Sequence, residues 1–303
     1  MSAQADFDAL IERHRAGEGW GPLARAVSLV ESTPPWELRV PGSAEPVHIV
    51  GVTGPPGVGK STLTARLIES FSGAGARAAV LAVDPSSPIS GGAVLGDRVR
   101  MESAITGRPE VFVRSLASRG AHGAVASATR NAARLLEASG SFDVVVIETA
   151  GAGQTEIAVA GMADTVVLVT VPGLGDAVQA IKAGLMEVAD LVVVNMSDRP
   201  GAQQTVRHLR LTLGRELVVK ETVATEGDGV DDLREELDRR WAAMRSEGAL
   251  DAARERKRIA EATLVAEEWI RRTGDNGGAA RPDDLKQAVK QMHPKTKQMS
   301  CQC

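Results

Sequence analysis

Residues 54–62 read Gly54-Pro55-Pro56-Gly57-Val58-Gly59-Lys60-Ser61-Thr62, which is the pattern G-x-x-x-x-G-K-S. A short apolar run, Val47–Val52, precedes this pattern, and apolar residues at helical spacing follow it. Glycines let such a loop curl so that successive backbone N–H groups point at phosphate oxygens, and the following helix adds its positive N-terminal end. We therefore expect Lys60 to reach the β- and γ-phosphates of a nucleoside triphosphate and the Ser61 hydroxyl to bind Mg²⁺. The alternative is a glycine-rich turn that happens to contain Lys-Ser.

Short apolar runs rich in β-branched residues recur along the chain, separated by longer amphipathic stretches. Such runs are typical of strands that are buried on both faces, as in a parallel sheet flanked by helices. The predicted strands are Val47–Val52, Ala78–Val83, Asp143–Ile147, Thr165–Val171, Leu191–Val194 and, as a sixth, Leu217–Val219. The sequence thus predicts an α/β fold of the P-loop NTPase type, a doubly wound, mainly parallel sheet. We expect an N-terminal helical extension over residues 1–46, the nucleotide-binding domain over 47–232, and a C-terminal helical arm with a mobile tail over 233–303.

Composition excludes some classes of protein. The 303 residues carry a net charge of −4, which argues against a nucleic-acid binder that works by broad phosphate neutralisation. No apolar run approaches the roughly 20 residues that span a bilayer, and the first residues lack the apolar region of a signal peptide, so we expect a cytoplasmic protein. The two cysteines, Cys301 and Cys303, are expected to lie in a solvated tail rather than in a disulfide framework.

Three acidic residues are candidates to help hold Mg²⁺, because each follows or lies near the end of a predicted strand. Asp84 follows the second strand, Asp97 lies in a glycine-rich loop, and Glu148 ends the third strand. Mg²⁺ prefers oxygen ligands of this kind together with substrate phosphates. The segment Glu148-Thr149-Ala150-Gly151 also matches the [DE]-x-x-G form of a nucleotide switch, whose glycine N–H can sense a γ-phosphate. We expect Lys60, Asp97 and Glu148 to carry the catalytic roles.

Two further loops indicate which base is bound. Asn195-Met196-Ser197-Asp198 ends the fifth predicted strand, where GTP-binding proteins carry N-K-x-D. The carboxylate of Asp198 would accept hydrogen bonds from guanine N1–H and the 2-amino group, which adenine cannot offer. Asn195 would tie the loops together, and Val223-Ala224-Thr225 is similar to the S-A-x loop whose backbone N–H contacts guanine O6. Both motifs are imperfect, since Met196 replaces Lys and Val223 replaces Ser, but together they predict guanine.

Longer stretches of the chain, between Leu10 and Leu233, resemble the MeaB/ArgK (MMAA-like) family of P-loop GTPases. They are Gly54–Thr62, Val83–Ser87, Leu95–Met101, Glu148–Glu156, Pro172–Asp176 and Gln179–Lys182. The resemblance implies a GTPase chaperone that gates cofactor loading and protects an adenosylcobalamin-dependent acyl-CoA mutase. It also implies a homodimer formed through the C-terminal arm, and an additional switch loop whose charged members here are Asp176 and Lys182.

The chain departs from the family at Met196, at Val223 and at Ala150–Gln154, where the family reads Val-Gly-Val-Gly-Gln. We expect the client to be methylmalonyl-CoA mutase or, since these departures suggest a divergent branch, a related 2-hydroxyacyl-CoA mutase.

The expected reaction is in-line attack of water on the γ-phosphate, with Lys60, Mg²⁺ and the loop amides stabilising the charge. No residue stands out as a general base, so we expect slow basal turnover that a partner stimulates. Two alternatives stay open. An ATP-dependent small-molecule kinase predicts ATP preference, against which Asp198 argues. A nickel-type metallochaperone GTPase predicts a His/Cys-rich tract, which the five histidines and two tail cysteines do not supply.

Overall fold

The computed structural model describes residues 2–34, 37–43, 45–85, 106–118, 122–149, 161–173, 188–213 and 217–258. Within them one sheet has the strand order β3-β2-β4-β1-β5-β6-β7, and all neighbouring strands pair in parallel. The strands are β1 (His48–Thr53), β2 (Ala78–Pro85), β3 (Val111–Ser118), β4 (Val144–Thr149), β5 (Thr165–Thr170), β6 (Leu191–Asn195) and β7 (Val218–Thr222). The prediction of a doubly wound α/β fold is confirmed.

Strand β3 is the strand that the sequence pattern did not predict. Arg114 and Ser115 interrupt its apolar run, and β3 lies at the edge of the sheet, paired with β2. An edge strand does not need the continuous hydrophobicity of a strand buried on both faces. Arg114 is instead accommodated by α2, where its guanidinium donates to Ser28 Oγ at 2.8 Å and lies 3.6 Å from Glu31.

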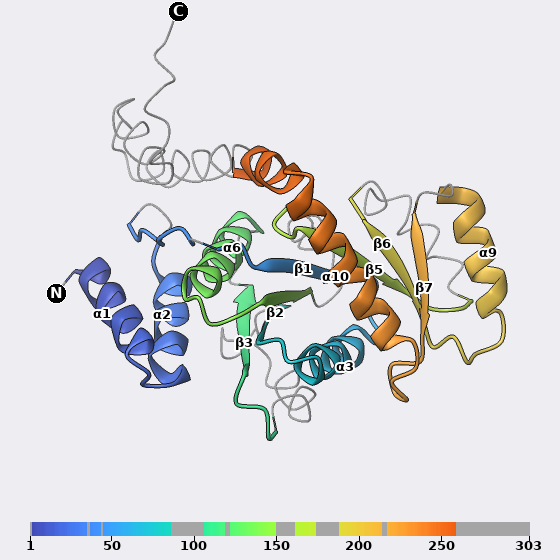
Figure 1. The fold of residues 1–303 in the computed structure, drawn as a ribbon, viewed down its shortest axis with the longest axis horizontal. Coiled ribbons are helices and arrows are strands. Elements are labelled where there is room, and N and C mark those ends of the chain that lie inside the picture. Colours follow the sequence, from blue (N-terminus) through green and yellow to red (C-terminus); the bar gives the residue numbers. More distant parts are fainter. Residues whose placement is uncertain are drawn as a thin grey trace, which may run out of the picture.

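Helices cover both faces of the sheet. The named helices are α1 (Ala3–Arg15), α2 (Trp20–Ser32), α3 (Lys60–Gly73), α6 (His122–Ala138), α9 (Ala202–Leu213) and α10 (Val230–Ser246). Successive side chains of a strand point to opposite faces. Val167 therefore packs in the same core as α3 and α10, while its neighbours Val166 and Leu168 face α6 and α9 respectively. Figure 1 shows α1 and α2 side by side at the β3 end of the sheet and α9 at the β7 end.

The described parts of the N-terminal extension and of the C-terminal arm pack onto the sheet. Phe7 of α1 and Val27 of α2 are buried in the core that also holds Leu81 of β2. At the other end of the chain, Trp241 of α10 stacks on His48, with ring centroids 4.8 Å apart. No helix in the described ranges is long and apolar enough to cross a bilayer.

The topology places the 54–62 loop at a branch point. The loop follows β1, which lies between β4 and β5, so that it starts at the carboxyl edge of the sheet with a strand on each side. From β1 the chain continues to β2, beyond β4, whereas β5, β6 and β7 extend the sheet in the other direction. In open α/β sheets, ligands bind at the carboxyl ends of strands where the strand order reverses in this way.

Candidate functional site

Two glycines of the 54–62 loop lie where a side chain has no room. Gly54 has φ +143°, and a Cβ built there would be 2.2 Å from the carbonyl oxygen of Val169 in β5. Gly59 has φ +85°, and its Cβ would be 2.5 Å from the Asn195 amide nitrogen. The loop therefore sits tightly between the ends of β5 and β6. Since its shape depends on these contacts, Gly54 and Gly59 fix where its amides point.

Lys60 begins α3, and its ammonium group is buried within the loop. Nζ donates to the carbonyl oxygens of Gly54 at 2.7 Å and Pro55 at 2.8 Å. Only 6% of the residue is exposed. The ammonium is thus already desolvated and held beside the N-terminus of α3, where an anion is favoured. A phosphate placed there meets a positive group whose position is set by the loop.

Ser61 and Glu148 are joined directly. The Ser61 hydroxyl donates to Glu148 Oε1 at 2.5 Å, and Glu148 is 4% exposed at the end of β4. This hydroxyl–carboxylate pair supplies the hard oxygen ligands that suit Mg²⁺. The described residues contain no group of three or more His, Cys, Asp or Glu side chains able to hold a metal ion. Mg²⁺ bound here would therefore need phosphate oxygens and water to complete its shell.

The remaining metal candidates are only partly placed. Asp84 lies near the end of β2, one residue beyond the Val83–Thr149 pair, so its backbone is at the same edge of the sheet as Glu148. Its side chain is not described. Asp97 lies outside the described residues, as do the expected switch segment from Ala150 to Glu156 and the two charged members of the additional loop, Asp176 and Lys182. Their roles stay predictions.

Asn195 connects the phosphate loop with the loop that follows β7. Its Nδ2 donates to the carbonyl oxygen of Val58 at 2.9 Å. Its Oδ1 accepts from the Thr222 hydroxyl and from the Ala224 amide, both at 3.1 Å. The amide is buried and all three bonds are local to the site, so the structure shows the bridging contacts that the sequence led us to expect of Asn195. A contact of Asn195 with the base stays a prediction.

Met196 and Asp198 lie in the turn after β6. Met196 has φ +55°, an uncommon conformation for a residue with a side chain, and its Cε lies 3.7 Å from the position of a Cβ built on Gly59. The thioether chain therefore covers the phosphate loop, where the aliphatic part of a lysine would also fit. Asp198 is exposed at this turn, where a carboxylate can meet an incoming ligand.

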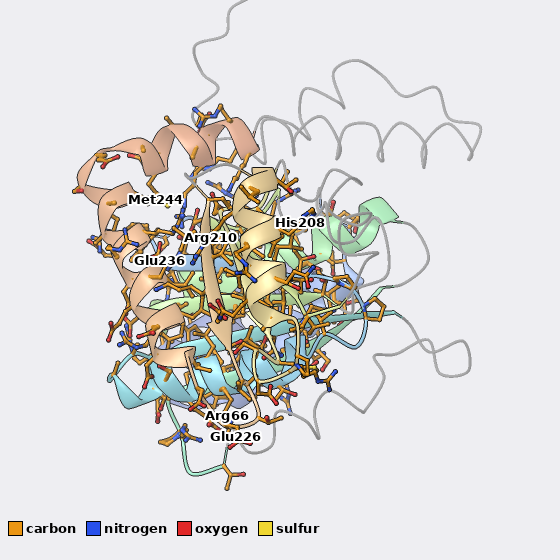
Figure 2. The ribbon with its side chains drawn as sticks, turned by 90° about the vertical axis from the view of Figure 1, so that its right-hand side faces the viewer. Arg66, His208, Arg210, Glu226, Glu236 and Met244 are labelled. Atoms are coloured by element: carbon orange, nitrogen blue, oxygen red, sulfur yellow. The ribbon has the colours of Figure 1, made fainter. Side chains whose placement is uncertain are left out.

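Arg66 of α3 is a site residue that the sequence pattern did not reveal. Its guanidinium donates to the carbonyl oxygens of Ala224 and Thr225, at 3.3 and 3.0 Å, and to Glu69 at 2.9 Å. Figure 2 shows Arg66 beside Glu226, the residue after this loop segment. In the sequence Arg66 is an ordinary arginine on an amphipathic helix, and its loop partners are 158 and 159 residues away. No local pattern could have indicated the contact.

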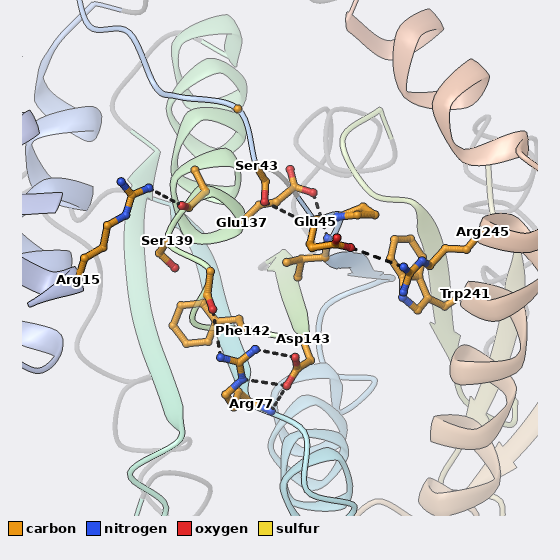
Figure 3. A pocket seen from close by; sticks show the side chains of 15 residues that line it. Arg15, Ser43, Glu45, Arg77, Glu137, Ser139, Phe142, Asp143, Trp241 and Arg245 are labelled. Atoms are coloured by element: carbon orange, nitrogen blue, oxygen red, sulfur yellow. Dashed lines mark hydrogen bonds and ion pairs between the residues drawn. The ribbon is translucent and has the colours of Figure 1, made fainter. Parts of the chain in front are cut away.

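A separate cavity lies at the opposite, amino edge of the sheet. It has a volume of about 670 Å³, and its lining includes Arg77, Glu137, Asp143, Trp241 and Arg245 (Figure 3). Two ion pairs lie in its lining. Arg245 is 3.7 Å from Glu45, and Arg77 binds Asp143 at 2.8 Å, which raises the arginine pKa and lowers that of the carboxyl group. This cavity is far from the phosphate loop along the strands and contains no arrangement typical of catalysis.

Beside this cavity, Arg254 joins three parts of the chain. Its guanidinium forms a fork with both carboxylate oxygens of Asp164, at 2.9 and 2.5 Å, and donates to Glu137 at 2.6 Å and to the carbonyl oxygen of Val47 at 2.7 Å. Burial alone lowers the pKa of Arg254, but the two carboxylates outweigh it and raise that pKa. We call Arg254, Asp164 and Glu137 the Arg254 clamp. It fastens helical residues 249–258 to the amino ends of β1 and β5.

Comparison with known proteins places the chain among GTPases. A family model described as "Methylmalonyl Co-A mutase-associated GTPase MeaB" matches residues 23–277. A putative GTPase of Pyrococcus horikoshii is 45% identical over 276 residues, covering 86% of each chain. The mitochondrial methylmalonic aciduria type A homolog of Mus musculus is 36% identical, covering 77% of this chain and 63% of its own. A crystal structure titled "LAO/AO transport system kinase" superposes with a TM-score of 0.61 at 25% identity, covering 95% of this chain and 97% of the other.

Proposed function

The chain belongs to the family of methylmalonyl Co-A mutase-associated GTPases MeaB, and from this premise we propose that it is a chaperone of an adenosylcobalamin-dependent acyl-CoA mutase. That it is a GTPase follows from the family and from relatives named as GTPases. The finer role is our proposal. It comprises gating of cofactor loading, protection of the mutase, slow basal hydrolysis stimulated by the client, and a homodimer formed through residues 233–303.

The observation that carries GTP hydrolysis is the connected set of contacts from Lys60 to Ala224. Lys60 would transfer from the carbonyl oxygens of Gly54 and Pro55 to the β- and γ-phosphates. Amides of the loop and of the first turn of α3 would bind phosphate oxygens. Ser61 and Glu148 would hold Mg²⁺, which supplies charge neutralisation to the transferring phosphoryl group when bound. Water would then attack in line.

Support for the mutase as client comes from the family description and from the mouse relative, whose name refers to methylmalonic aciduria. The proposed substrate of the client is methylmalonyl-CoA or a related 2-hydroxyacyl-CoA. Support for the homodimer is a set of apolar positions within an otherwise charged arm. Of these, Trp241 and Leu250 pack on their own chain, and Ile259, Leu264, Trp269 and Ile270 lie outside the described residues.

Base selectivity is the first test. Calorimetric titration with GDP and with ADP, Mg²⁺ present, should give tight binding of GDP alone. Asp198→Asn should weaken GDP binding and gain affinity for xanthosine diphosphate, because an amide N–H can donate to the 2-oxo group that replaces the 2-amino group. Equal or tighter binding of ADP would contradict guanine recognition and favour the kinase alternative.

The second test addresses the client. The purified chain is mixed with a methylmalonyl-CoA mutase or with a 2-hydroxyacyl-CoA mutase, and GTP hydrolysis, co-elution and cofactor loading are measured. Stimulated hydrolysis and GTP-dependent loading with one mutase would support the proposal and identify the client. Lys60→Ala is the control, since this variant should neither bind GTP nor respond to the mutase. Absence of binding and of stimulation with both would sink the chaperone role while leaving the GTPase intact.

A further inference from the structure

The loop 223–227 commits nearly all of its backbone amides to bonds within the fold. Val223 N–H donates to Asp228, Ala224 N–H to Asn195, and the N–H groups of Glu226 and Gly227 both to the carbonyl oxygen of Val223. Within the described part of the chain, the amide of Thr225 makes no such bond. This loop therefore presents one uncommitted N–H donor, at a residue whose side chain is exposed.

The direction of that N–H is set by Arg66. Peptide units are planar, and none in the described chain is cis, so the Thr225 N–H points opposite to the Ala224 carbonyl of the same unit. Arg66 Nε holds that carbonyl at 3.3 Å and Nη2 holds the next one, Thr225, at 3.0 Å. Two consecutive carbonyls are thereby turned toward α3. The Thr225 N–H is turned away from α3.

An arginine fits this task better than other residues. Its planar guanidinium presents Nε and Nη2 along one edge, which matches two neighbouring acceptors, and a lysine ammonium has no such fork. The third nitrogen, Nη1, binds Glu69 one turn along the same helix and so holds the plane of the group. Because α3 also begins with Lys60, the same helix contacts the phosphate loop at its first residue and the base loop near its middle, at Arg66.

We infer that Arg66 is a positioning residue for guanine recognition, which aims the Thr225 N–H at O6 of the base by holding the Ala224 and Thr225 carbonyl oxygens. This inference rests on the proposed function, since it requires that the base is guanine. It assigns to α3 a part in choosing the base as well as in binding phosphate.

The test pairs a change in Arg66 with a change in O6. Wild type, Arg66→Gln and Arg66→Lys are titrated with GDP and with 6-thioguanosine diphosphate, in which sulfur, a poor hydrogen-bond acceptor, replaces O6. We expect Arg66→Gln to weaken GDP binding about tenfold, the size of one lost hydrogen bond, and to leave binding of the thio analogue nearly unchanged. The affinity of Arg66→Lys for GDP should lie between those of wild type and Arg66→Gln. The ratio of GDP to inosine diphosphate affinity, which reports the 2-amino group, should stay constant.

Two controls isolate the contact. Glu69→Gln removes the ion pair of Arg66 but leaves the fork on the loop, so base preference should hold. Arg13→Gln removes a similarly exposed arginine that pairs with Glu18 far from the site. Thermal unfolding of each variant shows whether it is folded, which is expected because Arg66 is 42% exposed.

The outcomes separate the two proposals. Equal weakening of GDP and of the thio analogue would make Arg66 a general support of the loop and overturn the inference. Unchanged GDP binding by Arg66→Gln would also overturn the inference. In either case the proposed function stands if the wild type prefers GDP to ADP. Wild type that binds ADP as tightly as GDP would overturn both.

Discussion

Lys60 and Glu148 are both ionisable residues and both almost fully buried. Burying a charge is unfavourable unless hydrogen bonds compensate. Here Lys60 is held by two loop carbonyls and Glu148 by the Ser61 hydroxyl. Lys60 must exchange these carbonyl partners for phosphate oxygens when nucleotide binds, whereas Ser61 and Glu148 lie together at the place proposed for Mg²⁺.

Glu148→Gln should weaken Mg²⁺ binding with little effect on metal-free nucleotide affinity. The glutamine still accepts the Ser61 bond but lacks the negative charge that favours a divalent cation. We expect roughly a 10- to 100-fold rise in the Mg²⁺ concentration needed for half-maximal GTP hydrolysis. Asp198→Asn, which changes the base contact, should leave that concentration unchanged. An unchanged Mg²⁺ requirement in Glu148→Gln would show that Glu148 does not help to bind the metal ion.

Gly54→Ala and Gly57→Ala form a matched pair of loop substitutions. Both residues have positive φ, but a Cβ at Gly54 would be 2.2 Å from the Val169 carbonyl oxygen, whereas nothing lies within 4 Å of one at Gly57. Gly54→Ala should lower the free energy of unfolding by about 2–4 kcal/mol, and Gly57→Ala by about 1 kcal/mol from backbone strain alone. Urea unfolding measures both. Equal losses would mean that the contact with β5 relaxes freely.

At the scale of elements, the Arg254 clamp links the C-terminal helical residues 249–258 to the sheet. Asp164 also accepts the Ile49 amide, and Glu137 accepts the Val47 amide, so both carboxylates already hold the start of β1. Arg254 neutralises them where they are shielded from water. Lys257 adds a bond to the Ala163 carbonyl oxygen, and burial lowers the pKa of that lysine.

Arg254→Gln should destabilise the fold by about 3–5 kcal/mol, because it leaves two shielded carboxylates without their cation. Arg256→Gln is the matched control two residues away, since Arg256 is exposed and should change stability by less than about 0.5 kcal/mol. Urea unfolding of the two variants gives the comparison. Similar values would show that solvent reaches Asp164 and Glu137 well enough to replace the guanidinium.

For the whole molecule, the sheet separates two regions of different character. Its carboxyl edge carries the phosphate and base loops, and its amino edge carries the Arg254 clamp, His48 and the cavity of Figure 3. His48 lies buried between Trp241 and the Thr165 hydroxyl, 2.8 Å from its Nε2. Burial, partly opposed by the attraction of Asp164, lowers its pKa from 6.5 to about 4.

The stability of the fold should therefore depend on pH through His48. Its pKa is lower in the folded state, so its contribution is present above pH 6.5 and is lost as the pH falls toward 4, where the unfolded chain binds the proton first. From about pH 7 to about pH 5.5 the expected loss is about 1 kcal/mol. Urea unfolding at both pH values should show this loss in wild type and in the exposed control His208→Gln (Figure 2), and a smaller one in His48→Gln. An equal pH dependence in His48→Gln would contradict the assignment.

Sequence patterns predicted those parts of the molecule whose causes are local. The 54–62 loop is defined by neighbouring residues, and six strands are defined by continuous hydrophobicity. Strand β3 was not predicted because Arg114 interrupts its apolar run, and the hydrogen-bond partner of that arginine, Ser28 of α2, is 86 residues away in the sequence. The roles of Arg66 and Arg254 were not predicted because each arginine binds carbonyl or carboxylate groups that lie at least 90 residues away in the sequence. Such pairs come together only in the folded chain, and no spacing in the sequence predicts them.

The Arg254 clamp also bears on how the chain is made. Asp164 leaves the ribosome 90 residues ahead of the arginine that neutralises it, and Glu137 leaves it 117 residues ahead. At about 5–20 residues per second, Asp164 waits roughly 5–18 seconds for its partner. During that interval neither carboxylate has its guanidinium partner, so the Arg254 clamp can form only after the phosphate loop and both base-recognition loops have been synthesised.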